Sequence, residues 1–105
     1  MSGPEAGSVA QALDGVAGTL PDVERVEVEG TIEYRRGGRV FAVVTGPTAA
    51  FRLRPEIARA AVQTPDADPS PRGPGWVSFA PIDADGFALD RAAAWFESAW
   101  RLAAA

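Results

Sequence analysis

The first stretch of the chain with a helical pattern covers residues 8–20. Its apolar residues recur at helical spacing, at Val9, Ala12, Leu13, Val16 and Leu20. Ser8 is suited to cap the start of this helix. Pro21 ends it, because a proline disfavours the helical conformation of the residue before it.

Patterns typical of β-strands fill the next part of the chain. Valines alternate with acids over residues 23–29, which predicts a solvated edge segment. Two β-rich runs, 31–36 and 39–45, are separated by Gly37-Gly38, the signature of a two-residue hairpin turn. Gly46-Pro47 turns the chain again, and residues 49–54 predict a third strand of an antiparallel meander.

The hairpin turn also predicts a register. If Arg36 pairs with Arg39, then Tyr34 faces Phe41 and Ile32 faces Val43. We expect these four apolar side chains to share the core face, together with Phe51 and Leu53 of the third strand.

The second half of the chain predicts two helices and one strand. Pro55 suits the first turn of a short helix over residues 55–62. Residues 64–75 contain four prolines and no large apolar residue, which predicts a long extended loop. Residues 75–80 predict a strand, and the last helix is strongly amphipathic. Its apolar arc is centred on Ala92 and Ala99 and also holds Ala88, Leu89, Trp95, Phe96, Trp100 and Leu102.

This order of elements favours an α+β fold in two layers, an antiparallel sheet with helices packed on one face. A chain of 105 residues makes a single domain, which we place at residues 8–105 after a disordered N-terminal tail of residues 1–7.

Composition excludes several kinds of chemistry. The chain has no Cys and no His, which removes disulfides, thiolate zinc sites, cysteine nucleophiles and the serine–histidine triad. The acids near the last helix, Asp83, Asp85 and Asp90, are explained by the helix dipole, with Asp90 as a cap. We therefore expect no catalytic residue, no cofactor and no metal. Without a membrane-spanning apolar run or a signal peptide, the expected location is cytoplasmic.

Several short pieces of the sequence carry a family resemblance. They are Leu20-Pro21-Asp22-Val23, Gly38-Arg39-Val40-Phe41-Ala42, Phe51-Arg52-Leu53-Arg54-Pro55-Glu56 and Trp76-Val77-Ser78-Phe79. In this order they resemble the MmcQ/YjbR-like family of small bacterial proteins, from about residue 20 to 102. The resemblance implies the order α-β(3)-α-β(2)-α and a DNA-binding label that rests on fold similarity.

The sequence departs from the family pattern at two places. Gly75 stands where the family often has a polar residue or histidine, and the Pro-rich loop replaces the strand expected before Trp76. The small luciferase-like domain proteins of actinobacteria have a similar Leu-Pro-x-Val start, Gly-Trp-Val strand and aromatic last helix. Their strand with paired histidines is absent here, so this family is the second choice.

Charge is concentrated in the middle of the chain. Seven acids and one base lie in residues 1–34, one acid and six bases in residues 35–60, and six acids and three bases in residues 61–105. Alternation along the predicted strands places Arg35, Arg52 and Arg54 on the sheet face that the helices leave open, with Trp76 beside them. Val40, Ala42 and Val44 are expected between them on that face. The candidate binding residues are Arg35, Arg39, Arg52, Arg54, Arg72 and Trp76.

These residues allow several functions. We expect a non-catalytic domain that binds a partner protein or a second copy through its open sheet face. DNA binding is an alternative at the family level, which the net charge of −4 disfavours. A solvated face on which Glu33 pairs with the arginines is a further interpretation. The competing class is a small-molecule binder or enzyme with a pocket between sheet and helices, gated by residues 64–75.

Overall fold

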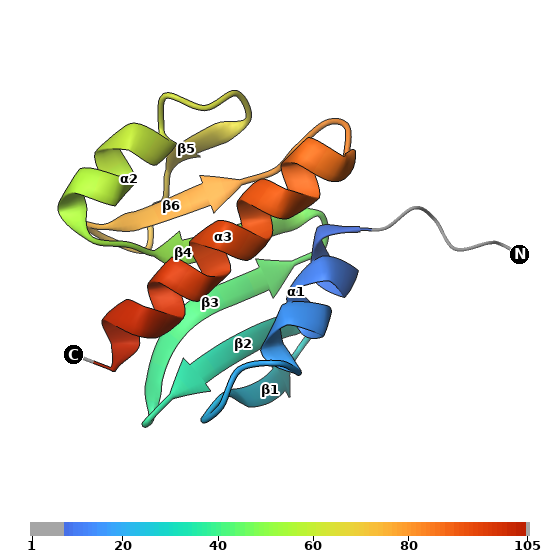
Figure 1. Ribbon diagram of the computed structural model, residues 1–105, viewed down its shortest axis with the longest axis vertical. Helices are drawn as coiled ribbons and strands as arrows, with labels where there is room; N and C mark the ends of the chain where they lie inside the picture. Colours follow the sequence, from blue (N-terminus) through green and yellow to red (C-terminus); the bar gives the residue numbers. More distant parts are fainter. Residues whose placement is uncertain (1–7, 105) are drawn as a thin grey trace, which may run out of the picture.

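A computed structural model describes residues 8–104, so the predicted tail at residues 1–7 lies outside the described residues (Figure 1). The described chain runs through α1 (Val9–Ala17), β1 (Glu24–Val28), β2 (Thr31–Arg36), β3 (Arg39–Thr45), β4 (Thr48–Arg52), α2 (Pro55–Ala61), β5 (Ala67–Pro69), β6 (Trp76–Phe79) and α3 (Gly86–Ala103). No helix within these residues is both long and apolar enough to span a membrane.

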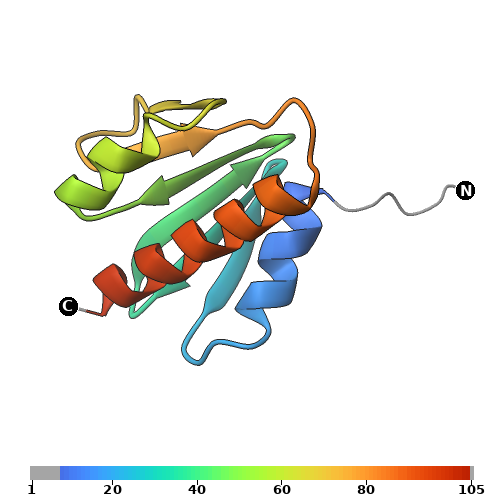
Figure 2. The same cartoon turned by 45° about the horizontal axis from the view of Figure 1, so that its top comes forward.

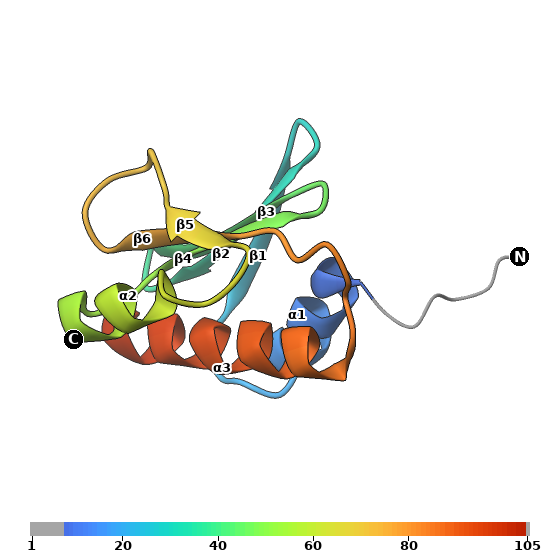
Figure 3. The ribbon, with the colours of Figure 1, turned by 90° about the horizontal axis from the view of Figure 1, so that it is seen from above.

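The fold is a two-layer α+β arrangement, as predicted. The strands form one antiparallel sheet in the order β1-β2-β3-β4-β6-β5. The three helices cover the same face of this sheet, which leaves the opposite face open (Figure 3). Figure 2 shows α3 running between α1 and α2 in the helical layer.

The sheet has one more strand at each edge, β1 and β5, than the predicted meander and the predicted strand at residues 75–80 would give. The segment expected as a solvated edge is the strand β1, which pairs with β2 along its whole length. The prediction of a strandless loop over residues 64–75 is wrong, because β5 lies in this segment and pairs with β6. Ala67 anchors β5 by its burial, and Pro69 fits there because β5 is an edge strand that needs no outward N–H donor.

A β-bulge changes the predicted register of the hairpin. Arg36 pairs with Arg39 as expected, but the register shifts between Tyr34 and Arg35, and Tyr34 then faces Ala42 instead of Phe41. Phe41 is the extra residue of the bulge, so Phe41 and Ala42 both belong to the core. The bulge thereby provides two consecutive core side chains from one strand.

The bulge also moves three valine and alanine side chains relative to the prediction. Ala42 and Val44 were expected on the open sheet face, yet both are buried in the core beneath the helices. Ile32 faces Val44, and Val43 faces Glu33 on the open side of the sheet. Val43 is nevertheless only 5% exposed, so the centre of the open face is not a bare apolar patch.

The core lies between the sheet and α3, whose small residues permit a close approach. Ala92 and Ala99 are fully buried at the centre of the helix, as the apolar arc predicts. Next to them, the Phe96 ring meets Tyr34 and Phe41 edge-on, with centroid distances of 4.9 Å and 5.1 Å. These aromatic contacts fix α3 over β2 and β3.

Polar side chains cap the two longer helices. The hydroxyl of Ser8 accepts a hydrogen bond from the Gln11 N–H at 3.1 Å, which confirms it as the cap of α1. At α3 the cap is Asp85, whose Oδ1 accepts from the Ala88 N–H at 2.9 Å. The expectation that Asp90 caps this helix is wrong, because Asp90 already lies inside it.

Candidate functional site

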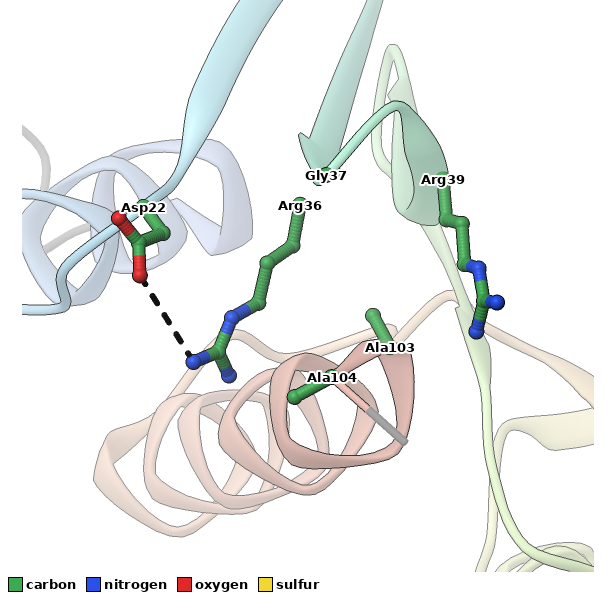
Figure 4. A pocket seen from close by; sticks show the side chains of 6 residues that line it. All are labelled: Asp22, Arg36, Gly37, Arg39, Ala103 and Ala104. Atoms are coloured by element: carbon green, nitrogen blue, oxygen red, sulfur yellow. Dashed lines mark ion pairs between the residues drawn. The ribbon is translucent and has the colours of Figure 1, made fainter.

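The candidate arginines do not all share one surface. Arg39 follows the hairpin turn and lines a pocket of about 470 Å³ at the C-terminal end of α3, on the helical side of the sheet. Figure 4 shows it across from Arg36, whose guanidinium lies 3.9 Å from the carboxylate of Asp22. Arg39 therefore stands apart from Arg52 and Trp76, which strand alternation places on the open sheet face.

Arg35 is neutralised by a neighbour on the same strand. Its Nη2 and Nε donate to Oε1 of Glu33 at 2.6 Å and 3.2 Å. Both side chains are only partly exposed. At this position the structure agrees with the interpretation in which Glu33 pairs with an arginine, so Arg35 contributes little positive charge to the open face.

Three of the candidate residues come together at the start of β6. Arg52 at the end of β4 is the cross-strand neighbour of Trp76, so the two side chains lie on the same face of the sheet. Arg72, from the segment between β5 and β6, lies over the Trp76 ring with its guanidinium carbon 5.0 Å from the ring centroid. Trp76 is thus flanked by two cations from separate segments.

The backbone around Trp76 is held by hydrogen bonds. The Gly75 carbonyl accepts from the Leu53 N–H at 2.8 Å, the Trp76 N–H donates to Gly73 at 3.1 Å, and the Trp76 carbonyl accepts from Ser70 at 2.9 Å. Gly75 has a φ of +83°, and a Cβ added there would lie 3.0 Å from the Leu53 carbonyl oxygen. A glycine is required here because the chain makes a left-handed turn against neighbouring backbone.

Two further arginines belong to α2 and its N-cap. Arg54 is the N-cap residue of α2 and lies beyond the end of β4, so it is not part of the sheet. Arg59 lines a mainly apolar hollow of about 220 Å³ together with Trp76. Sequence reasoning missed Arg59 as a site residue, because its helical position does not reveal what α2 packs against. We call Arg52, Arg59, Arg72 and Trp76 the Trp76 cluster.

The arginines of the Trp76 cluster carry positive charge that no ion pair neutralises within residues 8–104. Elsewhere in the described chain, Arg25, Arg35, Arg36 and Arg101 each form an ion pair with a carboxylate, whereas Arg54 and Arg91 form none. Within residues 8–104, Arg52, Arg59 and Arg72 form none, and all three are exposed. Two exposed arginines that form no ion pair, Arg52 and Arg72, therefore flank one half-buried indole.

A polar network on the other side of the sheet has a structural role. The hydroxyl of buried Tyr34 donates to Oδ1 of Asp14, and Arg25 Nε donates to the same oxygen at 3.0 Å. Burial, followed by the hydrogen bond to Asp14, raises the pKa of Tyr34 well above that of an exposed tyrosine. Asp14 also raises the pKa of the Arg25 guanidinium. The network ties α1 to β1 and β2.

The buried part of the described chain is almost entirely apolar. Among residues 8–104 the buried side chains are apolar apart from the hydroxyl of Tyr34, so no charged group lies inside the molecule. In the same part of the chain, no group of three acidic, His or Cys side chains is arranged to hold a metal ion. Of the acids near α3, Asp85 is occupied by helix capping.

Comparison with known proteins adds no further information. No family model, no curated protein and no solved structure matches the chain. The resemblance to the MmcQ/YjbR-like family therefore stays a prediction, and a functional proposal must rest on the geometry described above.

Proposed function

We propose that the protein is a non-catalytic binding domain that holds an acidic segment of a partner protein at the Trp76 cluster. The observation that carries this proposal is the position of Arg52 and Arg72 beside Trp76, with no carboxylate partner among residues 8–104. Tryptophan and arginine are the residues that most often dominate binding energy at protein interfaces. The sequence predicts partner binding through the whole open sheet face, and the proposal places this binding at the end of the face where Trp76 lies.

The chemistry of the cluster favours carboxylates over a nucleic-acid backbone. A nucleic acid needs a positive track along its phosphates, and a domain that binds one usually carries a basic balance. Here the net charge is −4, and the rest of the open face carries Glu24 and the Glu33–Arg35 pair. The cluster is short and local, which suits a few acidic side chains of a peptide segment.

The competing pocket function receives less support. It requires residues 64–75 to act as a gate, but β5 is part of the sheet and the chain after it is bonded to the Trp76 backbone. It also requires polar groups to orient a ligand between sheet and helices. The described interior supplies only the Tyr34 hydroxyl, which is already bonded to Asp14.

A direct binding assay tests the proposal. Fluorescence anisotropy would compare a labelled peptide of Asp and Glu around one central Phe with single- and double-stranded oligonucleotides, at low and physiological salt. We expect the acidic peptide to bind in a salt-dependent manner, and the double variant Arg52→Glu/Arg72→Glu to weaken binding about tenfold or more. Arg91→Glu is the matched control, since Arg91 is exposed, lies on α3 and forms no ion pair within residues 8–104.

The other outcomes each overturn the proposal. Binding of the oligonucleotides without the peptide would assign the cluster to nucleic acid instead. If light scattering shows a dimer that charge reversal at Arg52 and Arg72 dissociates, the cluster binds a second copy of the chain instead. Absence of any binding at low salt would remove the function from this cluster.

A further inference from the structure

Two large apolar side chains stand exposed just before and at the start of α3. Ile82 is 92% exposed and Phe87 is 79% exposed, and the only other exposed large apolar residue within residues 8–104 is Val28. Single exposed apolar residues are common on protein surfaces, but these two line one pocket. Ile82 lies in the segment that connects β6 to α3 and Phe87 in the first turn of α3, and Figure 1 shows both parts of the chain.

The pocket between these side chains has a volume of about 400 Å³. Among the residues that line it, Phe79 and Ala88 are buried and Pro65 and Pro81 add apolar surface. This volume lies within the range of protein clefts that hold a ligand group or a peptide side chain. The pocket can therefore accept an apolar side chain that reaches between Ile82 and Phe87.

Hydrogen bonds fix the walls of the pocket. Asp66 accepts from the Ile82 N–H through Oδ2 at 3.3 Å, and its backbone carbonyl accepts from Ala80 at 3.0 Å. On the opposite side, Asp85 caps α3 through the Ala88 N–H at 2.9 Å. The pocket is thus formed before a ligand arrives, which lowers the entropic cost of binding.

The charge around the pocket indicates the kind of occupant. Three carboxylates line it, from Asp66, Asp83 and Asp85, against one base, Arg91. None of the four side chains forms an ion pair within residues 8–104. A second copy of the chain related by a two-fold axis would bring these carboxylates against one another, which is repulsive. Residues 1–7 contain no Lys or Arg and only one large apolar residue, Met1, so they do not match the pocket.

We infer that this pocket, which we call the Phe87 pocket, docks a short partner segment with an apolar side chain flanked by Lys or Arg. The apolar side chain enters between Ile82 and Phe87, and the basic side chains meet Asp66 and Asp83. The Phe87 pocket and the Trp76 cluster lie at opposite ends of β6 and carry opposite charge. The inference therefore does not depend on the proposed function of the Trp76 cluster.

The test uses the full chain and a labelled peptide with a central Leu-Leu pair and one lysine on each side. We expect anisotropy to show binding that Phe87→Ala and Ile82→Ala each weaken about tenfold, as for an interface anchor. Asp83→Lys should weaken it at least threefold and reduce its salt dependence. A peptide with glutamates in place of the lysines should show no binding that depends on Phe87, and Arg101→Ala, at the other end of α3, should leave binding of the lysine peptide unchanged.

Controls keep the result interpretable. Because Ile82 and Phe87 are almost fully exposed, both alanine variants should retain the thermal midpoint of the parent protein. Amide chemical shifts should change at residues 82–88 on peptide addition. Failure of the lysine peptide to bind at low salt, binding that Phe87→Ala leaves unchanged, or a dimer that Phe87→Ala dissociates would each overturn the inference.

Discussion

The guanidinium carbon of Arg36 lies 3.9 Å from the centroid of the Trp100 indole ring. The same arginine donates from Nη1 to the Trp100 carbonyl at 3.1 Å, and the Trp100 Nε1–H donates to the Pro21 carbonyl at 2.9 Å. This residue pair therefore joins the end of β2, the last turns of α3 and the segment between α1 and β1. Figure 4 shows that Arg36 also points toward Asp22 in that segment.

Replacement of the indole should loosen all three segments. Trp100→Phe keeps an aromatic ring but removes the donor to Pro21 and weakens the cation–π contact, so we expect a loss of about 1–2 kcal/mol in unfolding free energy. Urea denaturation measures it. Arg101→Ala is the control, because its exposed pair with Glu97 should contribute at most about 0.5 kcal/mol. Equal stability of Trp100→Phe and the parent protein would contradict this role.

The hydroxyl of Tyr34 should stabilise the attachment of α1. Tyr34→Phe removes the hydrogen bond to Asp14 but keeps the ring contact with Phe96, so we expect a loss of about 1–2 kcal/mol. Chemical denaturation would measure the loss. In Tyr34→Phe, hydrogen exchange of the α1 amides should be faster than in the parent protein, whereas exchange of the α3 amides should change less. A variant with unchanged α1 protection would show that Asp14 does not tether this helix.

The raised pKa of Tyr34 also predicts an alkaline limit to stability. The folded protein holds the phenol protonated, whereas the unfolded chain releases this proton from about pH 10 upward. The contribution of Tyr34 is therefore complete below about pH 10 and declines as pH rises further. Urea midpoints between about pH 9 and about pH 11 should fall more steeply in the parent protein than in Tyr34→Phe. Tyr34 is the single tyrosine of the chain, so tyrosinate absorbance reports its ionisation directly.

Helix capping gives a comparison between two aspartates of the same region. Asp85→Ala removes the acceptor for the Ala88 N–H, and we expect a loss of about 1 kcal/mol. Asp90→Ala changes the same charge inside α3 at an exposed position and should stay within about 0.5 kcal/mol of the parent protein. Thermal denaturation of both variants would measure the difference, and equal losses would contradict the assignment of Asp85 as the cap.

Gly75 should link stability to the geometry of the Trp76 cluster. Gly75→Ala places a Cβ 3.0 Å from the Leu53 carbonyl oxygen at a φ of +83°. Gly38→Ala is a close control, since Gly38 has a φ of +81° but no atom near the added Cβ. Backbone strain should lower the free energy of unfolding of both variants by about 1–2 kcal/mol, and the loss should be larger for Gly75→Ala because of the added close contact. Only Gly75→Ala should also weaken binding of the acidic peptide, as measured by anisotropy.

Local signals in the sequence predicted much of the fold. Gly37 and Gly38 both have positive φ values, as the two-residue hairpin turn requires. The alanine-centred arc of the last helix correctly placed Ala92 and Ala99 against the sheet. The bulge at Phe41 could not be predicted in the same way, because no glycine marks it. It is favoured by contacts of Tyr34 and Phe41 with Phe96, a residue far along the chain.

The candidate sites were only partly predictable for the same reason. Arg52 and Trp76 were identified from strand alternation and Arg72 from its place in the Pro-rich loop, and the structure brings the three together. Arg59 joins them only because α2 packs beside residues 73–77. The exposure of Ile82 and Phe87 could not be predicted either, since a sequence does not show whether an apolar residue in a loop finds a partner.

The two edges of the sheet determine how another molecule can approach the protein. β1 presents an alternation of Glu24, Arg25 and Glu27 with valines, and β5 consists of three residues that end in Pro69. A charged edge and a proline edge both discourage the addition of a foreign strand. The sheet edges are therefore poorly suited to bind an extended peptide through main-chain hydrogen bonds, a mode of binding that depends little on the peptide's sequence. Any partner would then have to be bound through side chains, whose chemistry discriminates between sequences as a backbone ladder does not.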